Sequence, residues 1–128
     1  MKIEGEGRLV RIFLGESDRF EGRPLYEAIV LLARAEGIAG ATVLRGLMGF
    51  GASSRIHTTK ILRLSEDLPI VVEIVDRADR IAAILPKLDR MVGEGLITLE
   101  KVDVIAYRHD AAAPGARATE EGAGSAAG

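Results

Sequence analysis

The stretch LPIVVEIV at residues 68–75 is almost continuously apolar and rich in the β-branched residues Val and Ile. Such a run is typical of a central strand that is buried on both faces of a sheet. Pro69 must then lie at the first turn of the strand, because proline cannot donate a ladder hydrogen bond. The run therefore predicts the centre of a β-sheet, and the flanking segments are expected to supply its neighbours.

The segment after this strand has the strongest helical periodicity in the chain. Its apolar residues recur at offsets of three, four, seven and eleven, on one face of a helix: Ile81, Ile84, Leu85, Leu88 and Val92. Asp76 is predicted to be the N-cap, with Asp79 near the positive end of the helix. The stripe continues through Pro86, so one helix with a bend at this proline is expected.

The remaining helix and strands show weaker patterns. A helix is expected from Pro24, which suits a first helical turn, to about Glu36. Gly37 then follows as a residue that can adopt the left-handed conformation at the helix end. Strand patterns occur at residues 8–14, 41–48 and 96–108.

The last of these strands changes phase along its length. Ile97 and Leu99 share one face, whereas Val102 and Val104 have the opposite parity. A one-residue slip of this kind predicts a bulge or a corner at Glu100-Lys101.

The order strand, helix, strand, strand, helix, strand predicts an α+β fold of the ferredoxin-like type, β-α-β-β-α-β. Two right-handed crossovers then give a four-stranded antiparallel sheet with both helices on one face. Residues 1–110 are expected to form this single domain. Residues 111–128 are rich in Ala and Gly and contain no larger aliphatic residue, so this C-terminal tail is predicted to be disordered.

Two helices leave one face of such a sheet uncovered, yet the strands carry apolar residues at both parities. Phe13 alternates with Ile12 and Leu14, and Val71 is followed by Val72. An uncovered apolar face of this size is normally an association surface. The pattern predicts a homo-oligomer packed sheet to sheet, and it leaves open whether the symmetry is two-fold or three-fold.

Residues 45–60 form a long, polar, glycine-hinged excursion between the second and third strands. Long connections in compact domains are often functional. The glycines between Gly46 and Gly51 could expose backbone N–H groups to an anion, or could simply form a hinge. His57 lies beside Arg55 and Thr58, where it could contact a phosphate or a carboxylate.

Composition excludes several classes of function. The 128 residues have a net charge of −2, a pI of about 5.7 and 4% aromatic residues, which argues against nucleic-acid binding. The apolar runs are far shorter than the roughly 20 residues that span a bilayer, so no membrane insertion is expected. No cysteine is present, and two histidines suggest no metal site. A cytoplasmic location is expected.

Several motifs together resemble one small prokaryotic family, the domain of unknown function 190. They include Gly15-Glu16-Ser17-Asp18, Gly40-Ala41-Thr42-Val43 and Leu64-Ser65-Glu66-Asp67-Leu68-Pro69, and the resemblance covers roughly residues 5 to 109. That family is grouped with the PII-like proteins. The resemblance implies a ferredoxin-like subunit and, usually, a trimer.

The PII signalling proteins bind nucleotides in a cleft between subunits, built from a Gly-Phe-Gly and a Gly-Asp-Gly motif. Gly49-Phe50-Gly51 and Gly93-Glu94-Gly95 resemble these two motifs. Ala52-Ser53 and Leu96 stand where those proteins have Arg-Gln and Lys, and their two C-terminal arginines would fall on Tyr107 and His109. Most of the cationic triphosphate clamp is thus absent.

The resemblance implies a non-enzymatic, PII-like sensor that binds a small anionic ligand, such as a nucleotide, at clefts between subunits. Residues 49–60 would be its effector loop, and by family association a membrane transporter is one conceivable partner. The alternatives are a small enzyme that uses His57 as acid or base, or a structural oligomer without a ligand. The expected ligand-binding residues are Gly49, Phe50, Gly51, Ser53, Ser54, Arg55, His57, Thr58, Gly93, Glu94 and Gly95.

Overall fold

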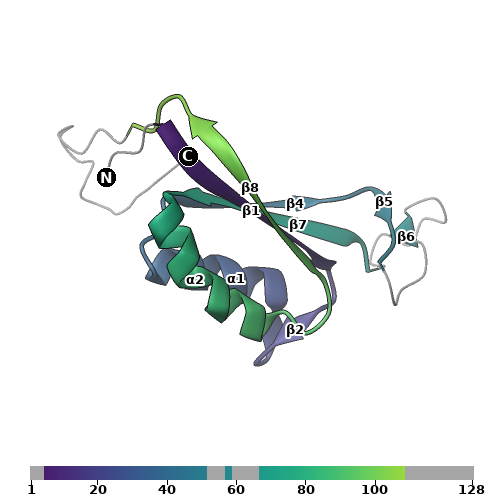
Figure 1. Ribbon diagram of the computed structural model, residues 1–128. Coiled ribbons are helices and arrows are strands. Elements are labelled where there is room, and N and C mark those ends of the chain that lie inside the picture. Colours follow the sequence, from purple (N-terminus) through teal and green to yellow (C-terminus); the bar gives the residue numbers. More distant parts are fainter. Residues whose placement is uncertain (1–4, 52–56, 59–66, 109–128) are drawn as a thin grey trace, which may run out of the picture.

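The computed structural model describes residues 5–51, 57–58 and 67–108, and it confirms the ferredoxin-like fold (Figure 1). The main sheet is antiparallel with the strand order β4-β7-β1-β8, and both helices lie on one of its faces. Its strands are β1 (Gly5–Gly15), β4 (Gly40–Arg45), β7 (Pro69–Asp76) and β8 (Leu96–Val104), and the helices are α1 (Leu25–Ala35) and α2 (Ala78–Met91).

The connection between β1 and α1 contains a small hairpin that the sequence pattern did not predict. Strands β2 (Arg19–Phe20) and β3 (Arg23–Pro24) pair across Glu21 and Gly22, both of which have positive φ, at 50° and 85°. Two-residue hairpin turns favour this left-handed backbone because it matches the twist of the strands. The hairpin leads directly into α1, which begins at the residue after Pro24.

The end of α1 agrees with the sequence. Glu36 is the C-cap, and Gly37 has φ +75°, the left-handed conformation expected of the residue that follows.

The hydrophobic core lies between the sheet and the two helices. β1 and β7 contribute alternate residues, and each helix contributes one stripe: Val10, Ile12, Leu14, Ile70, Val72, Ile74, Leu25, Ile29, Ala33, Ile81, Ile84 and Leu88. Burying one large aliphatic side chain contributes about 1.5–3 kcal/mol. The three such side chains of α2 therefore outweigh the roughly 3 kcal/mol cost of a proline inside a helix. This balance explains why α2 continues through Pro86.

The expectation that the third strand is buried on both faces is wrong for a single chain. Along β7 burial alternates, so that Val72 and Ile74 are buried while Val71 and Val75 are only partly covered. The reason is that the helices cover one face only, and the other face of the central strand stays open (Figure 1).

The predicted bulge in the last strand is also wrong. The pairing of β1 with β8 runs without interruption from Gly5 opposite Val104 to Phe13 opposite Leu96, and β8 ends at Val104, not at residue 108. The apolar residues change parity because Val102 and Val104 lie opposite glycines. A Cβ atom at Gly7 would lie 3.2 Å from Val104 Cγ2, so these valines occupy the space that a side chain would need.

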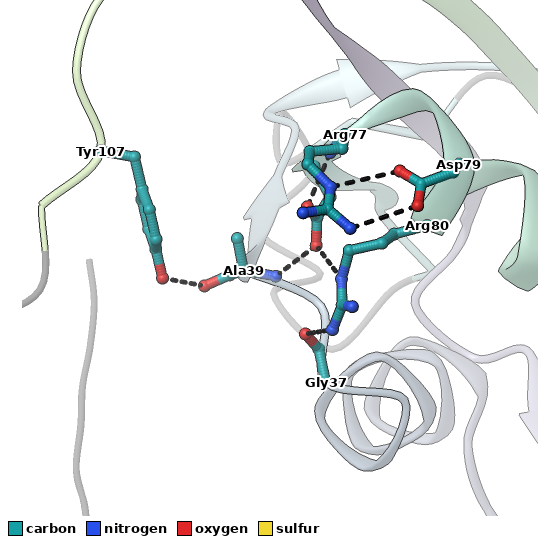
Figure 2. A network of polar contacts seen from close by, with 7 residues as sticks. Gly37, Ala39, Arg77, Asp79, Arg80 and Tyr107 are labelled. Carbon is teal, nitrogen blue, oxygen red and sulfur yellow. Dashed lines mark hydrogen bonds and ion pairs between the residues drawn. The ribbon is translucent and has the colours of Figure 1, made fainter. Parts of the chain in front are cut away.

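Asp76 is not a helix N-cap, contrary to the sequence prediction. It is the last residue of β7 and is completely buried, while Arg77 occupies the cap position without a side-chain cap. Asp76 Oδ1 accepts a hydrogen bond from the Arg77 N–H at 2.6 Å. Asp76 Oδ2 accepts from the Ala39 N–H at 2.9 Å and from Arg80 Nε at 3.3 Å (Figure 2).

This network joins three parts of the chain. Arg80 Nη2 also donates to Gly37 O at 2.6 Å, so Asp76 and Arg80 together fix the α1–β4 turn to the first turn of α2. Asp79 lies in that first turn, as expected, and its pKa is lowered by the hydrogen bond from the Arg77 guanidinium. In the described part of the chain, neither helix has the length and apolar character needed to cross a membrane.

Replacing Asp76 by Ala is expected to lower the free energy of unfolding by about 3 kcal/mol. The substitution leaves two backbone N–H groups and the Arg80 guanidinium without their buried acceptor. Urea denaturation at fixed protein concentration measures the change. Asp79→Ala is the matched control, because this exposed carboxylate should leave the midpoint almost unchanged. Equal effects of the two substitutions would contradict the role assigned to Asp76.

Candidate ligand-binding site

The base of the long loop between the second and third predicted strands contains more secondary structure than the sequence suggested. We call this base, formed by residues 45–51, 57–58 and 67–69, the root of the excursion. β4 ends at Arg45 and not at Met48, and a separate two-stranded ladder follows, made of β5 (Met48–Gly49) and β6 (His57–Thr58). In this ladder Gly49 lies opposite His57, and Met48 opposite Thr58. Five of the expected site residues therefore come together here or directly after β5: Gly49, Phe50, Gly51, His57 and Thr58. The expected residues Ser53, Ser54 and Arg55 lie outside the described residues.

Pro69 fixes the geometry of this root. The Gly46 N–H donates to Pro69 O at 2.7 Å. Cβ atoms at Gly46 and Gly49 would lie 2.8 Å and 3.2 Å from Pro69 Cγ, so both glycines pack directly against the proline ring. A side chain at residue 46 would force Pro69 to shift, and one at residue 49 would fit only tightly, so these glycines allow the chain to come back beside the start of β7.

A second set of contacts ties the turn after β1 to the residues before β7. The Glu16 N–H donates to Leu68 O at 2.8 Å, and the Ser17 N–H donates to Asp67 Oδ1 at 2.7 Å. Arg45 Nη2 lies 2.8 Å from Glu16 Oε2, which connects the end of β4 to the same turn. The sequence prediction missed Glu16, Arg45 and Asp67 as site residues, although two of them stand in the motifs that carried the family resemblance.

The turn of Gly93, Glu94 and Gly95 connects α2 to β8 and is exposed. Gly95 has φ +148°, and a Cβ atom at this position would lie 2.6 Å from Phe13 O. Glycine is thus required at residue 95 because the turn passes directly over the backbone of β1.

The segments that carry the two glycine motifs join the main sheet at the same end but at opposite edges. Register places Leu44, Val71, Phe13 and Leu96 in one row across β4, β7, β1 and β8. Gly46 follows the β4 end of this row, and Gly95 precedes its β8 end. Three strand spacings separate these edges by about 14 Å. The chain therefore leaves the main sheet toward residues 49–51 at one edge and returns to it through residues 93–95 at the other.

Tyr107, which stands at a position of the absent arginine clamp, lies at the opposite end of the sheet. Its hydroxyl donates to Ala39 O at 3.1 Å, next to the Asp76 network (Figure 2). The length of β8, from Leu96 to Val104, separates it from Gly95 by roughly 27 Å along the strand. A cleft that used both ends of β8 would again need more than one chain.

Electrostatics at the root come mainly from Arg45 and the acidic residues around it. Within residues 5–51, 57–58 and 67–108, no group of three or more His, Cys, Asp or Glu residues could hold a metal ion.

Comparison with known proteins identifies the family. The family model of DUF190, described as "Uncharacterized ACR", matches residues 7–104. A UPF0166 protein of Aquifex aeolicus (strain VF5) is 41% identical over 98 residues, which is 77% of this chain and 92% of the relative. A UPF0166 protein of Methanocaldococcus jannaschii is 38% identical over 95 residues, covering 73% of this chain and 87% of the relative.

Solved structures share the fold at lower identity. One is CPII of Thiomonas intermedia K12 bound to ADP and bicarbonate, with a TM-score of 0.58, 17% identity and coverage of 77% of this chain and 88% of that one. Another is CutA of Synechococcus elongatus PCC7942, with a TM-score of 0.52, 13% identity and coverage of 84% and 85%. CPII is described as a nitrogen regulatory PII-like protein. This chain belongs to the DUF190 family, and its fold is that of the PII-like proteins.

Proposed function

We propose that this protein is a non-enzymatic, PII-like regulatory protein that binds a small anionic ligand at clefts between the subunits of a homo-oligomer. The ligand class that fits best is an adenine nucleotide, and residues 49–60 are the segment through which ligand binding reaches a partner protein. A ligand changes such a contact only if it binds the two states of that segment with different affinity.

The observation that carries the proposal is the position of the two glycine motifs. At one end of the sheet, the segment that leads to residues 49–51 leaves the edge strand β4, and residues 93–95 lead into the opposite edge strand β8. In a closed ring of identical subunits, one edge of each subunit faces the other edge of its neighbour. The two motifs of neighbouring subunits can then line one cleft.

The open face of the sheet supports the homo-oligomer. Its row Leu44, Val71, Phe13 and Leu96 is apolar across all four strands, and Leu44 and Leu96 are 48% and 55% exposed. Beyond β4, Leu47, Met48 and Phe50 are 63–78% exposed. An apolar surface that extends from the sheet to the root of the excursion favours association of copies, and we propose three-fold symmetry as in PII proteins.

The nature of the ligand is supported by the fold and by the backbone of the root. Structures of CPII with this fold contain ADP, AMP and bicarbonate. Glycine-rich backbone at residues 49–51 can present N–H groups to a phosphate. Leu96 and Tyr107 supply no positive charge where PII proteins have cations, so a mono- or diphosphate fits this chain better than a triphosphate.

Calorimetry with ADP, AMP and adenosine tests the ligand class. We expect saturable binding of ADP or AMP and at least about tenfold weaker binding of adenosine, because adenosine lacks the charged group that accepts the hydrogen bonds. The nucleotide should be recovered unchanged after long incubation. Turnover would favour the enzyme alternative, and the absence of any binding would favour a purely structural oligomer.

Leu44→Asp is expected to dissociate the oligomer and to abolish nucleotide binding, because it places a charge in the apolar row of the open face. Native mass spectrometry reports the assembly, and calorimetry reports binding. Leu31→Asp is the matched control, since Leu31 is exposed to a similar extent (42%) but lies on α1. The account fails if Leu44→Asp remains oligomeric or if both variants dissociate.

A further inference from the structure

Arg45 carries an exposed positive charge at the root of the excursion. Among the side chains that the structure describes between residues 40 and 69, it alone is cationic. Its side chain is 57% exposed, and its Nη2 donates a hydrogen bond to Glu16 Oε2 at 2.8 Å. A guanidinium has five N–H donors in a planar fork that matches the geometry of a phosphate. The exposed part of this fork can be reached by a ligand.

Glu16 is an incomplete partner for this guanidinium. Its second oxygen, Oε1, is buried and accepts no hydrogen bond. Strong guanidinium–carboxylate pairs are commonly bidentate, with both oxygens engaged, whereas this pair uses one oxygen. A single-contact pair of partly exposed side chains contributes little to stability. Exchange of Glu16 for another anion would therefore cost the fold little.

The surroundings place Arg45 beside the glycine backbone of the candidate site. Gly46, the next residue, donates its N–H to Pro69 O, and Gly49 packs on the same proline ring. The chain from Arg45 to Gly49 thus folds around Pro69 and does not extend away from it. An anion at residues 49–51 would be within reach of the Arg45 guanidinium after a change of side-chain rotamer.

We infer that Arg45 is the residue that binds the anionic group of the ligand, and that Glu16 holds the guanidinium until the ligand displaces it. Glu16 is then an internal competitor of the phosphate. Its carboxylate, whose side chain is 24% exposed, is released to solvent when Arg45 turns to the ligand. The inference rests on the proposed function, because it assigns a cation to the same site. This chain lacks most of the cationic residues that bind the phosphates in PII proteins, and Arg45 would supply a positive charge in their place.

Two substitutions in this pair should have opposite effects on the affinity for ADP. Arg45→Gln is expected to weaken ADP binding by about tenfold or more, because it removes one charge-assisted contact. Glu16→Gln is expected to tighten ADP binding by roughly threefold to tenfold, because it removes the competing negative charge. Neither substitution should change the affinity for adenosine, and Arg45→Lys should retain part of the ADP affinity.

The pair Arg77 and Asp79 provides a matched control. It is also an exposed arginine–carboxylate contact, at 3.2 Å, but it lies at the opposite end of β7. Arg77→Gln and Asp79→Asn should leave the affinity for ADP unchanged, which excludes a general effect of net charge. Melting temperatures of all variants report whether each one folds.

The outcomes separate this inference from the proposed function. If the wild-type protein binds none of ADP, AMP and inorganic pyrophosphate, both are overturned. If it binds ADP but both substitutions leave the affinity unchanged, the inference alone is overturned. The same holds if Glu16→Gln weakens ADP binding as Arg45→Gln does, since the pair would then act only to hold the root together.

Discussion

Two helices can cover only one face of a four-stranded sheet, and the rest of this structure depends on that constraint. It makes burial along β7 alternate, and it leaves Leu44, Val71, Phe13 and Leu96 as an apolar row on the open face. Next to this row the same face carries charged side chains: Arg11 contacts Glu73 at 3.0 Å and Glu100 at 2.7 Å, and the hydrogen bond with Glu73 raises the pKa of Arg11. A surface that covers this face must match both rows, which favours a partner with the same pattern, namely another copy of the chain.

The same end of the sheet carries the proposed site. Pro69 begins the central strand β7, and it also fixes Gly46 and Gly49, while the adjacent turn at Glu16 and Ser17 contacts Asp67, Leu68 and Arg45. These contacts therefore attach the root of the excursion to the main sheet. A ligand bound at this root would act on the sheet edge and on the following segment together, which is the arrangement that a regulatory protein requires.

The fold could be predicted from the sequence because each element has a local pattern, such as the stripe of α2 and the apolar run of β7. The predictions were wrong where the conformation of a residue depends on a contact with a residue far away in the sequence. Asp76 has the sequence position of an N-cap, but its buried carboxylate accepts a hydrogen bond from the N–H of Ala39, 37 residues away, and the parity change in β8 comes from Gly7 on β1. The Glu16–Arg45 contact joins residues 29 apart, and the strand order places β4 and β8, which adjoin the two glycine motifs, at opposite edges of the sheet. Neither can be derived from spacing along the chain.

The central claim is that each ligand site needs two copies of the chain, and complementation between two variants tests it most directly. Gly51→Asp places a negative charge in one half of the proposed cleft, outside the apolar association surface, and Gly93→Asp places one in the other half, where a Cβ atom meets no neighbour. Each variant alone should bind no ADP. Co-expressed mixed oligomers should regain about a quarter of the sites, because random mixing reunites two intact halves with that frequency. Mixed oligomers that bind no ADP, or either variant binding it alone, would contradict the claim.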